Sequence, residues 1–145
     1  LVLRDYHSPN IIWRGERAGN DRLAIIDFQD ALIGPSAYDV ASLALDARVT
    51  IPRELERQIV ETYCAARIRN GPFDREAFDE AYAIVAAQRN SKILGIFVRL
   101  DVRDGKPQYL KHLPRIRDYL ARALAHPALA DLRALYRQVG FVDSA

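Results

Sequence analysis

The first thirty residues hold the densest group of side chains that could do chemistry. Asp5 and Asn10 form the pattern Asp-x-x-x-x-Asn, and Asp27 follows a short apolar run further along. Carboxylate and amide oxygens are hard ligands of the kind that Mg²⁺ takes, usually with only one or two carboxylates from the protein. Phosphoryl transfer also needs an acidic group near the acceptor hydroxyl. Each residue alone is also a common turn former or cap, but the ordered set favours a phosphoryl-transfer site.

Two short apolar runs separate the members of this set. Ile11–Trp13 and Leu23–Ile26 flank a polar stretch, residues 14–22, that contains two glycines and an asparagine. Such runs around a Gly/Asn loop predict a β-hairpin, with Asn10 before its first strand and Asp27 after its second.

The rest of the chain has helical periodicity, which predicts a mainly α fold with one small β-hairpin near the N-terminus. The first predicted helix covers about 38–46 with Ser36 as N-cap, and the second runs from Pro52 to the Asn70-Gly71-Pro72 stop. The third runs from the Asp74 N-cap towards Val102, with a break at Asp104-Gly105. The last two cover about 108–125 and 129–139.

Composition restricts the function classes. The chain has 145 residues, of which 50% are hydrophobic and 28% charged, and a net charge of +2. These values are ordinary for a globular domain and give no concentrated basic charge for nucleic acid. No apolar run is long enough to span a membrane. The single cysteine, Cys64, rules out an intrachain disulfide and suits a reducing cytosol, so we expect a cytoplasmic protein.

Two other enzyme classes lack their sequence patterns. His112 and His126 have no cysteine or histidine partner at metal-ligand spacing, so a zinc site is not expected. Ser8, Ser36 and Ser42 lack the Gly-x-Ser-x-Gly context of a hydrolase nucleophile.

Four segments together resemble a known family. They are Arg4–Ser8, Asp27–Ala31, Tyr38-Asp39 and Gly95–Phe97. The pattern is similar to the aminoglycoside phosphotransferase and choline kinase branch of the protein-kinase-like fold. It looks closest to bacterial anomeric sugar kinases, which phosphorylate N-acetylmuramate and N-acetylglucosamine at the 1-hydroxyl. Leu3 stands where family members often have histidine, a position that is usually structural.

The resemblance covers nearly the whole chain and implies its organisation. Residues 1–145 would form the helical C-terminal lobe, with the catalytic loop and metal-binding hairpin in 1–35 and a helical subdomain in 36–145. The N-terminal ATP-clamping lobe would be absent. The chain contains no methionine and begins on an apolar run, so we expect it to be a fragment of a longer protein.

The resemblance also implies a role for each polar residue of the motif. Asp5 would accept or orient the proton of the attacking hydroxyl, and Asn10 and Asp27 would hold Mg²⁺ that bridges the phosphates of ATP. Asp30 would lie near the metal or the acceptor. Asp39 would anchor the catalytic loop through backbone N–H groups.

His7 invites a catalytic role because it lies beside an aspartate. The resemblance assigns the role of base to Asp5, so we expect His7 to be structural or to orient the substrate.

A basic stripe lies on the predicted long helix. At 100° per residue, Arg89, Lys92, Arg99 and Arg103 fall within about 80° of arc on one face. Such a stripe could receive an acidic sugar, or it could be a solvated surface. The resemblance places this helix near the acceptor cleft, so Arg89 and Arg99 are predicted substrate contacts.

The predicted function is therefore ATP-dependent, Mg²⁺-dependent phosphoryl transfer to a hydroxyl of a small molecule. The favoured acceptor is an amino sugar. Alternative acceptors are an aminoglycoside, a choline-like alcohol or another metabolite. A non-catalytic binding module or pseudokinase remnant is the alternative of a different class. No nucleic-acid or membrane partner is expected. The fragment alone is expected to be inactive and to self-associate through an apolar surface left by the missing lobe.

Overall fold

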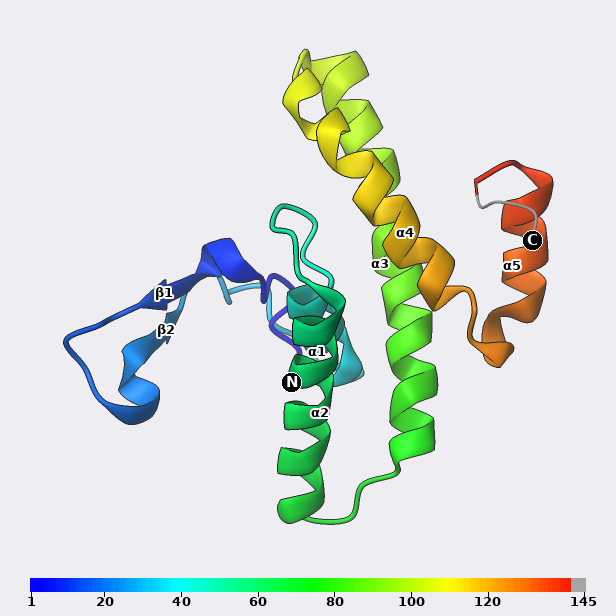
Figure 1. Cartoon of the computed structure of the whole chain (residues 1–145). Coiled ribbons are helices and arrows are strands. Elements are labelled where there is room, and N and C mark those ends of the chain that lie inside the picture. Colours follow the sequence, from blue (N-terminus) through cyan, green and yellow to red (C-terminus); the bar gives the residue numbers. More distant parts are fainter. Residues whose placement is uncertain (142–145) are drawn as a thin grey trace. The chain divides into compact units, whose positions relative to one another are not determined.

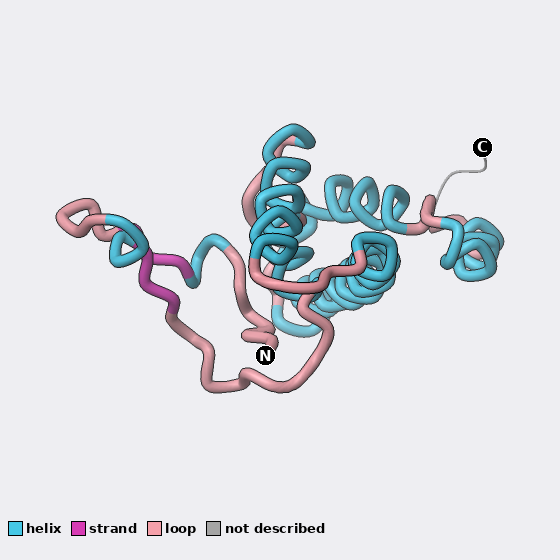
Figure 2. Tube along the Cα trace, turned by 90° about the horizontal axis from the view of Figure 1, so that it is seen from below, coloured by secondary structure: helices cyan, strands magenta, loops and turns pink. Residues whose placement is uncertain are grey.

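A computed structural model describes residues 1–141 of the chain, which divides into two compact units, Leu1–Phe73 (unit 1) and Asp74–Ala145 (unit 2). Strands are confined to one short hairpin in the described chain, and helices supply most of the remaining regular structure (Figure 2). The predicted mainly α fold class is confirmed. The segment predicted as one helical subdomain, 36–145, contributes helices to both units.

Unit 1 begins with the predicted hairpin. A 3₁₀ turn η1, Ser8–Asn10, leads into strand β1, Ile11–Trp13, which pairs antiparallel with strand β2, Leu23–Ile25 (Figure 1). The pairs are Ile11 with Ile25, Ile12 with Ala24 and Trp13 with Leu23. The connecting loop contains a further 3₁₀ turn η2, Gly19–Arg22. The hairpin prediction is confirmed, with β2 ending one residue earlier than expected.

A second backbone connection ties the ends of this region together. Val2 and Leu32 exchange both backbone hydrogen bonds, at 2.8 and 2.9 Å, in an isolated antiparallel bridge. Gly34 lies against this bridge, because a Cβ there would stand 3.2 Å from both the Leu32 and Val2 side chains. The segment before the loop that carries Asp5 is therefore held beside the segment that leaves the hairpin.

Helices α1, Ala37–Ala44, and α2, Arg53–Arg69, complete unit 1 and lie side by side (Figure 1). The prediction that Ser36 caps α1 is wrong, because Ser36 has helical dihedral angles and its side chain makes no capping hydrogen bond. The α1 helix also ends earlier than predicted, so that Asp46 lies outside it.

Unit 2 is built on the long helix α3, Arg75–Asp104. Its predicted N-cap is confirmed, because the Asp74 carboxylate accepts a hydrogen bond from the Ala77 N–H at 2.9 Å. Its predicted stop is also confirmed: Gly105 adopts the left-handed conformation, with φ of 63°.

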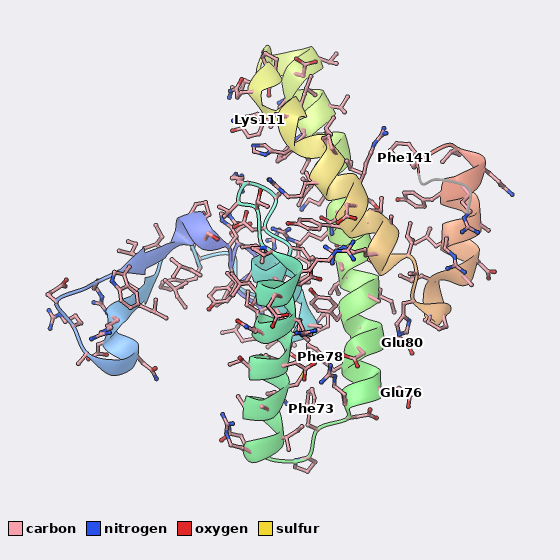
Figure 3. The ribbon with its side chains drawn as sticks, viewed as in Figure 1. Phe73, Glu76, Phe78, Glu80, Lys111 and Phe141 are labelled. Carbon is pink, nitrogen blue, oxygen red and sulfur yellow. The ribbon has the colours of Figure 1, made fainter. Side chains whose placement is uncertain are left out.

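The chain then returns along α3 (Figure 1). The predicted helix at 108–125 is divided into a 3₁₀ turn η3, Pro107–His112, and helix α4, Leu113–Ala123. Pro114 explains the division, since it has no N–H to continue an earlier helix but suits a first helical turn. The predicted last helix likewise divides into a 3₁₀ turn η4, Pro127–Leu129, and helix α5, Ala130–Gln138. Phe141, labelled in Figure 3, follows α5 and packs edge-on against Tyr136.

Large apolar side chains are exposed in much of the first 33 residues. Leu1, Trp13, Phe28, Leu32 and Ile33 are 77, 64, 57, 46 and 87% exposed. The apolar surface expected where a further lobe would pack, and self-association through it, both stay predictions. No helix within residues 1–141 is long and apolar enough to cross a bilayer.

Candidate active site

Asn10 connects the two segments that carry the predicted chemistry. Its side-chain Nδ2 donates to the backbone carbonyl of Asp5 at 2.9 Å and approaches Asp27 Oδ2 at 3.4 Å. Its backbone carbonyl accepts from the Ile26 N–H at 3.1 Å, which continues the pairing of β1 and β2. The hairpin thus brings Asn10 and Asp27 together, although 17 positions separate them.

Asp27 turns the chain as it leaves the hairpin. Its φ is +61°, in the left-handed region that few residues other than glycine adopt, although Asp and Asn tolerate it better than most. Its Oδ1 accepts from Gln29 Nε2 at 2.6 Å. Sequence reasoning missed this contact. Its only trace in the sequence is the amide side chain of Gln29, two residues after Asp27.

Asp5 is exposed on a loop whose backbone is hydrogen-bonded to Asp39, a residue of α1. Asp39 Oδ2 accepts from the Leu3 N–H at 2.7 Å, and its Oδ1 accepts from the Arg4 N–H at 3.0 Å. Arg4 has a φ of +72°, a strained conformation for a residue with a side chain. The expected contact between Asp39 and backbone N–H groups is therefore present, and it supports the strained residue immediately before Asp5.

Asp46 is a contact of the loop that sequence reasoning did not find. This residue is 0% exposed, and its Oδ2 accepts from the Ser8 N–H at 2.9 Å. Burial alone would raise the pKa of the Asp46 carboxyl. Hydrogen bonds from Arg48, Ser8 and Val49 outweigh burial and lower that pKa below its usual value. Asp46 is therefore a buried carboxylate that stays ionised.

The other predicted supporting residues differ in burial. His7 is 8% exposed and lies in the loop between Asp5 and Asn10, where its carbonyl accepts from the Asn10 N–H at 2.9 Å. Asp30 is exposed in a turn closed by the Ala31 N–H, which donates to the Phe28 carbonyl at 3.1 Å. This burial is compatible with a structural role for His7 and leaves Asp30 accessible to a ligand.

Arg89 and Arg99 both belong to α3 in unit 2, but their environments differ. Arg89 is 7% exposed, whereas Lys92, Arg99 and Arg103 are exposed. Arg103 forms an ion pair with Asp104 at 2.6 Å. The predicted stripe is thus not one uniform surface, because its first member is buried. Substrate contacts of Arg89 and Arg99 stay predictions.

The donor set of unit 1 suits Mg²⁺ better than a transition metal. No group of three or more His, Cys, Asp or Glu able to hold a metal is present among residues 1–141. Mg²⁺ does not need such a cage, since phosphates and water supply most of its ligands. Asp27 offers a carboxylate, and the Asn10 amide keeps an oxygen available while its nitrogen bonds Asp5 and Asp27. These residues fit a magnesium site that is completed by a phosphorylated ligand.

The N-terminal part of the chain matches a known protein family. The family model described as "Phosphotransferase enzyme family" matches residues 1–81, which include the loop, the hairpin and both supporting aspartates.

Three relatives named N-acetylmuramate/N-acetylglucosamine kinase match over most of the chain. The protein from Caulobacter vibrioides is 44% identical over 133 residues, which is 92% of this chain and 36% of the relative. The proteins from Pseudomonas aeruginosa and Pseudomonas putida are 38% and 35% identical, over 93% and 96% of this chain. The chain spans 40% and 41% of their respective lengths.

Proposed function

Since the chain belongs to the phosphotransferase enzyme family, we propose that it forms the catalytic-loop part of a kinase that transfers the γ-phosphoryl group of ATP to a hydroxyl of an N-acetylated amino sugar. The acceptor class rests on the relatives named N-acetylmuramate/N-acetylglucosamine kinase. The observation that carries the reaction class is the junction of Asn10 with Asp5 in the same loop and with Asp27, which lies 17 positions further along the chain.

Asp5 is the proposed acceptor of the sugar hydroxyl's proton. Its carboxylate is exposed while its backbone is fixed on both sides: the Asp5 N–H donates to the Leu3 carbonyl at 3.0 Å, and the Asp5 carbonyl accepts from Asn10. As the hydroxyl oxygen bonds to the γ-phosphorus, its proton passes to Asp5 and the bond to the leaving ADP oxygen breaks. A fixed, accessible carboxylate suits this role.

Asn10 and Asp27 are the proposed holders of Mg²⁺. When bound, the ion would neutralise charge on the transferring phosphoryl group and align the phosphates. Asn10 Nδ2 lies 3.4 Å from Asp27 Oδ2, so the two side chains are neighbours and the amide oxygen of Asn10 is left for the ion. Gln29 orients the second oxygen of Asp27, so that the carboxylate is held before any ligand binds. Asp30 is proposed to lie near the metal or the acceptor.

The first test is a transfer assay. The protein would be extended upstream through the ATP-binding lobe that the resemblance implies. ATP and Mg²⁺ would be supplied with N-acetylmuramate, N-acetylglucosamine, choline or kanamycin as acceptor. We expect a phosphorylated product with the N-acetyl sugars only. Transfer to choline or kanamycin alone would replace the acceptor class, and transfer to none of the four would contradict the proposed function.

The magnesium role of Asp27 gives a separate prediction. Asp27→Asn preserves the side-chain size and suits the left-handed backbone, but it removes the negative charge. We expect the half-saturating Mg²⁺ concentration to rise by about 10- to 100-fold. The measurement is the initial rate against Mg²⁺ concentration at fixed ATP. Asp30→Asn, tested in parallel, is expected to change this dependence less, and a larger effect at Asp30 would reassign the metal site.

A further inference from the structure

A single buried carboxylate joins the catalytic loop to the end of α1. Asp46 Oδ2 accepts from the Ser8 N–H at 2.9 Å, across 38 positions of sequence. Its other oxygen, Oδ1, accepts from the Arg48 N–H at 2.8 Å and from the Val49 N–H at 3.3 Å. The two oxygens therefore have different tasks: Oδ1 closes the turn after α1, and Oδ2 holds the loop.

The bond to Ser8 is placed where it controls a predicted metal ligand. Ser8 is the first residue of the η1 turn, and Asn10 is the last. The Asn10 N–H donates to the His7 carbonyl at 2.9 Å and the Ile11 N–H donates to the Ser8 carbonyl, so backbone hydrogen bonds connect both ends of the turn. A shift of Ser8 would consequently shift the Asn10 side chain relative to Asp5 and Asp27.

Asp46 acts at a different point of the loop from Asp39. The N–H groups of Leu3 and Arg4, before Asp5, donate to Asp39, whereas the N–H of Ser8, after Asp5, donates to Asp46. The loop is thus held by carboxylates on both sides of its proposed base. Neither carboxylate needs to touch a substrate to act in this way.

We propose that Asp46 is a positioning residue, which fixes the η1 turn through the Ser8 N–H and thereby places the Asn10 amide for Mg²⁺. This inference rests on the proposed phosphotransfer function and deepens it. Asp46 lies outside the motif segments that carry the family resemblance, and its burial keeps it from contact with bulk solvent.

Two substitutions test the proposal through opposite partners of the same hydrogen bond. In Asp46→Asn, the amide oxygen can still accept from the Arg48 and Val49 N–H groups. The amide NH₂ then faces the Ser8 N–H, and two donors cannot form a hydrogen bond with each other. Ser8→Pro removes the N–H itself. Proline suits this position, because it opens a 3₁₀ turn and the preceding His7 is extended, with φ of −142° and ψ of 166°.

We expect both variants to lower kcat by about 10- to 100-fold and to raise the half-saturating Mg²⁺ concentration, with little change in KM for the sugar. Mn²⁺ binding, followed by electron paramagnetic resonance in the presence of ATP, gives a readout that does not need turnover. Ser8→Ala keeps the N–H, so we expect it to lower kcat and Mn²⁺ affinity much less than Ser8→Pro does.

A destabilised control separates positioning from simple loss of stability. Val40→Ala truncates a buried side chain of α1 without touching the loop's hydrogen bonds, and it is expected to lower the melting temperature but not to change the Mg²⁺ dependence. Unchanged Mg²⁺ dependence and Mn²⁺ affinity in both Asp46→Asn and Ser8→Pro would overturn the inference. One outcome would separate the two proposals: the wild-type protein transfers no phosphoryl group to sugar, yet Asp46→Asn and Ser8→Pro weaken its Mn²⁺ binding. That outcome would refute the proposed function and still support the role of Asp46.

Discussion

Replacing Asp5 by asparagine is expected to lower kcat for sugar phosphorylation by about 10²- to 10⁴-fold, with KM for the sugar nearly unchanged. Asparagine has the size of aspartate but cannot accept the proton of the attacking hydroxyl. The substitution leaves the loop intact, because the hydrogen bonds at this position use the Asp5 backbone and not its side chain. The measurement is steady-state kinetics of the upstream-extended protein with saturating ATP and Mg²⁺.

A matched control for this variant is Asp21→Asn. Asp21 is an exposed aspartate in the η2 turn of the hairpin loop, away from the junction of Asn10 with Asp27. Its substitution is expected to leave kcat unchanged. If Asp5→Asn retained wild-type kcat, another group would have to accept the proton, and the proposed role of Asp5 would be wrong.

The second large effect is expected at Asp39. Asp39→Ala removes the acceptor of two backbone N–H groups, and hydrogen bonds to a charged acceptor contribute about 1.5–3 kcal/mol each. We expect the free energy of unfolding to fall by about 3 kcal/mol after allowance for partial exposure. We also expect kcat to fall by about 10²-fold, because Arg4 loses the partner that holds its left-handed backbone next to Asp5.

Urea unfolding and steady-state kinetics together measure these two losses. Asp131→Ala is the control, since Asp131 also lies in the first turn of a helix, α5, but is exposed. It isolates the helix-dipole contribution of about 0.3–1 kcal/mol. Equal destabilisation by Asp39→Ala and Asp131→Ala would show that the contacts of Asp39 with the loop contribute little.

The parts of the fold that depend on local sequence were predictable. The hairpin, the Asp74 cap and the Gly105 stop all follow from residues within a few positions of the feature they determine. The errors occurred where a nearby proline or a tertiary contact overrides periodicity. Pro114 delays the start of α4, and the predicted cap at Ser36 makes no side-chain hydrogen bond.

The candidate site shows the same division. The types and order of Asp5, Asn10 and Asp27 were visible in sequence, since ligand chemistry depends on residue type. The contact of Asp46 with Ser8 was not visible, because an aspartate near a helix end commonly makes a local turn. Asp46 does make that turn with Arg48 and Val49, and nothing local distinguishes it from one that also bonds a distant loop.

The length of the hairpin does not affect how Asn10 and Asp27 meet. The pair Ile11–Ile25 and the bond from the Ile26 N–H to the Asn10 carbonyl fix Asn10 against Asp27 at the base of the hairpin. The exposed tip, with η2, takes no part in these contacts. Insertions and deletions at the tip should therefore be tolerated during evolution, and grafted sequences should be tolerated there in engineered proteins. A motif search that demands a constant interval between these two residues would miss proteins in which only the tip has grown.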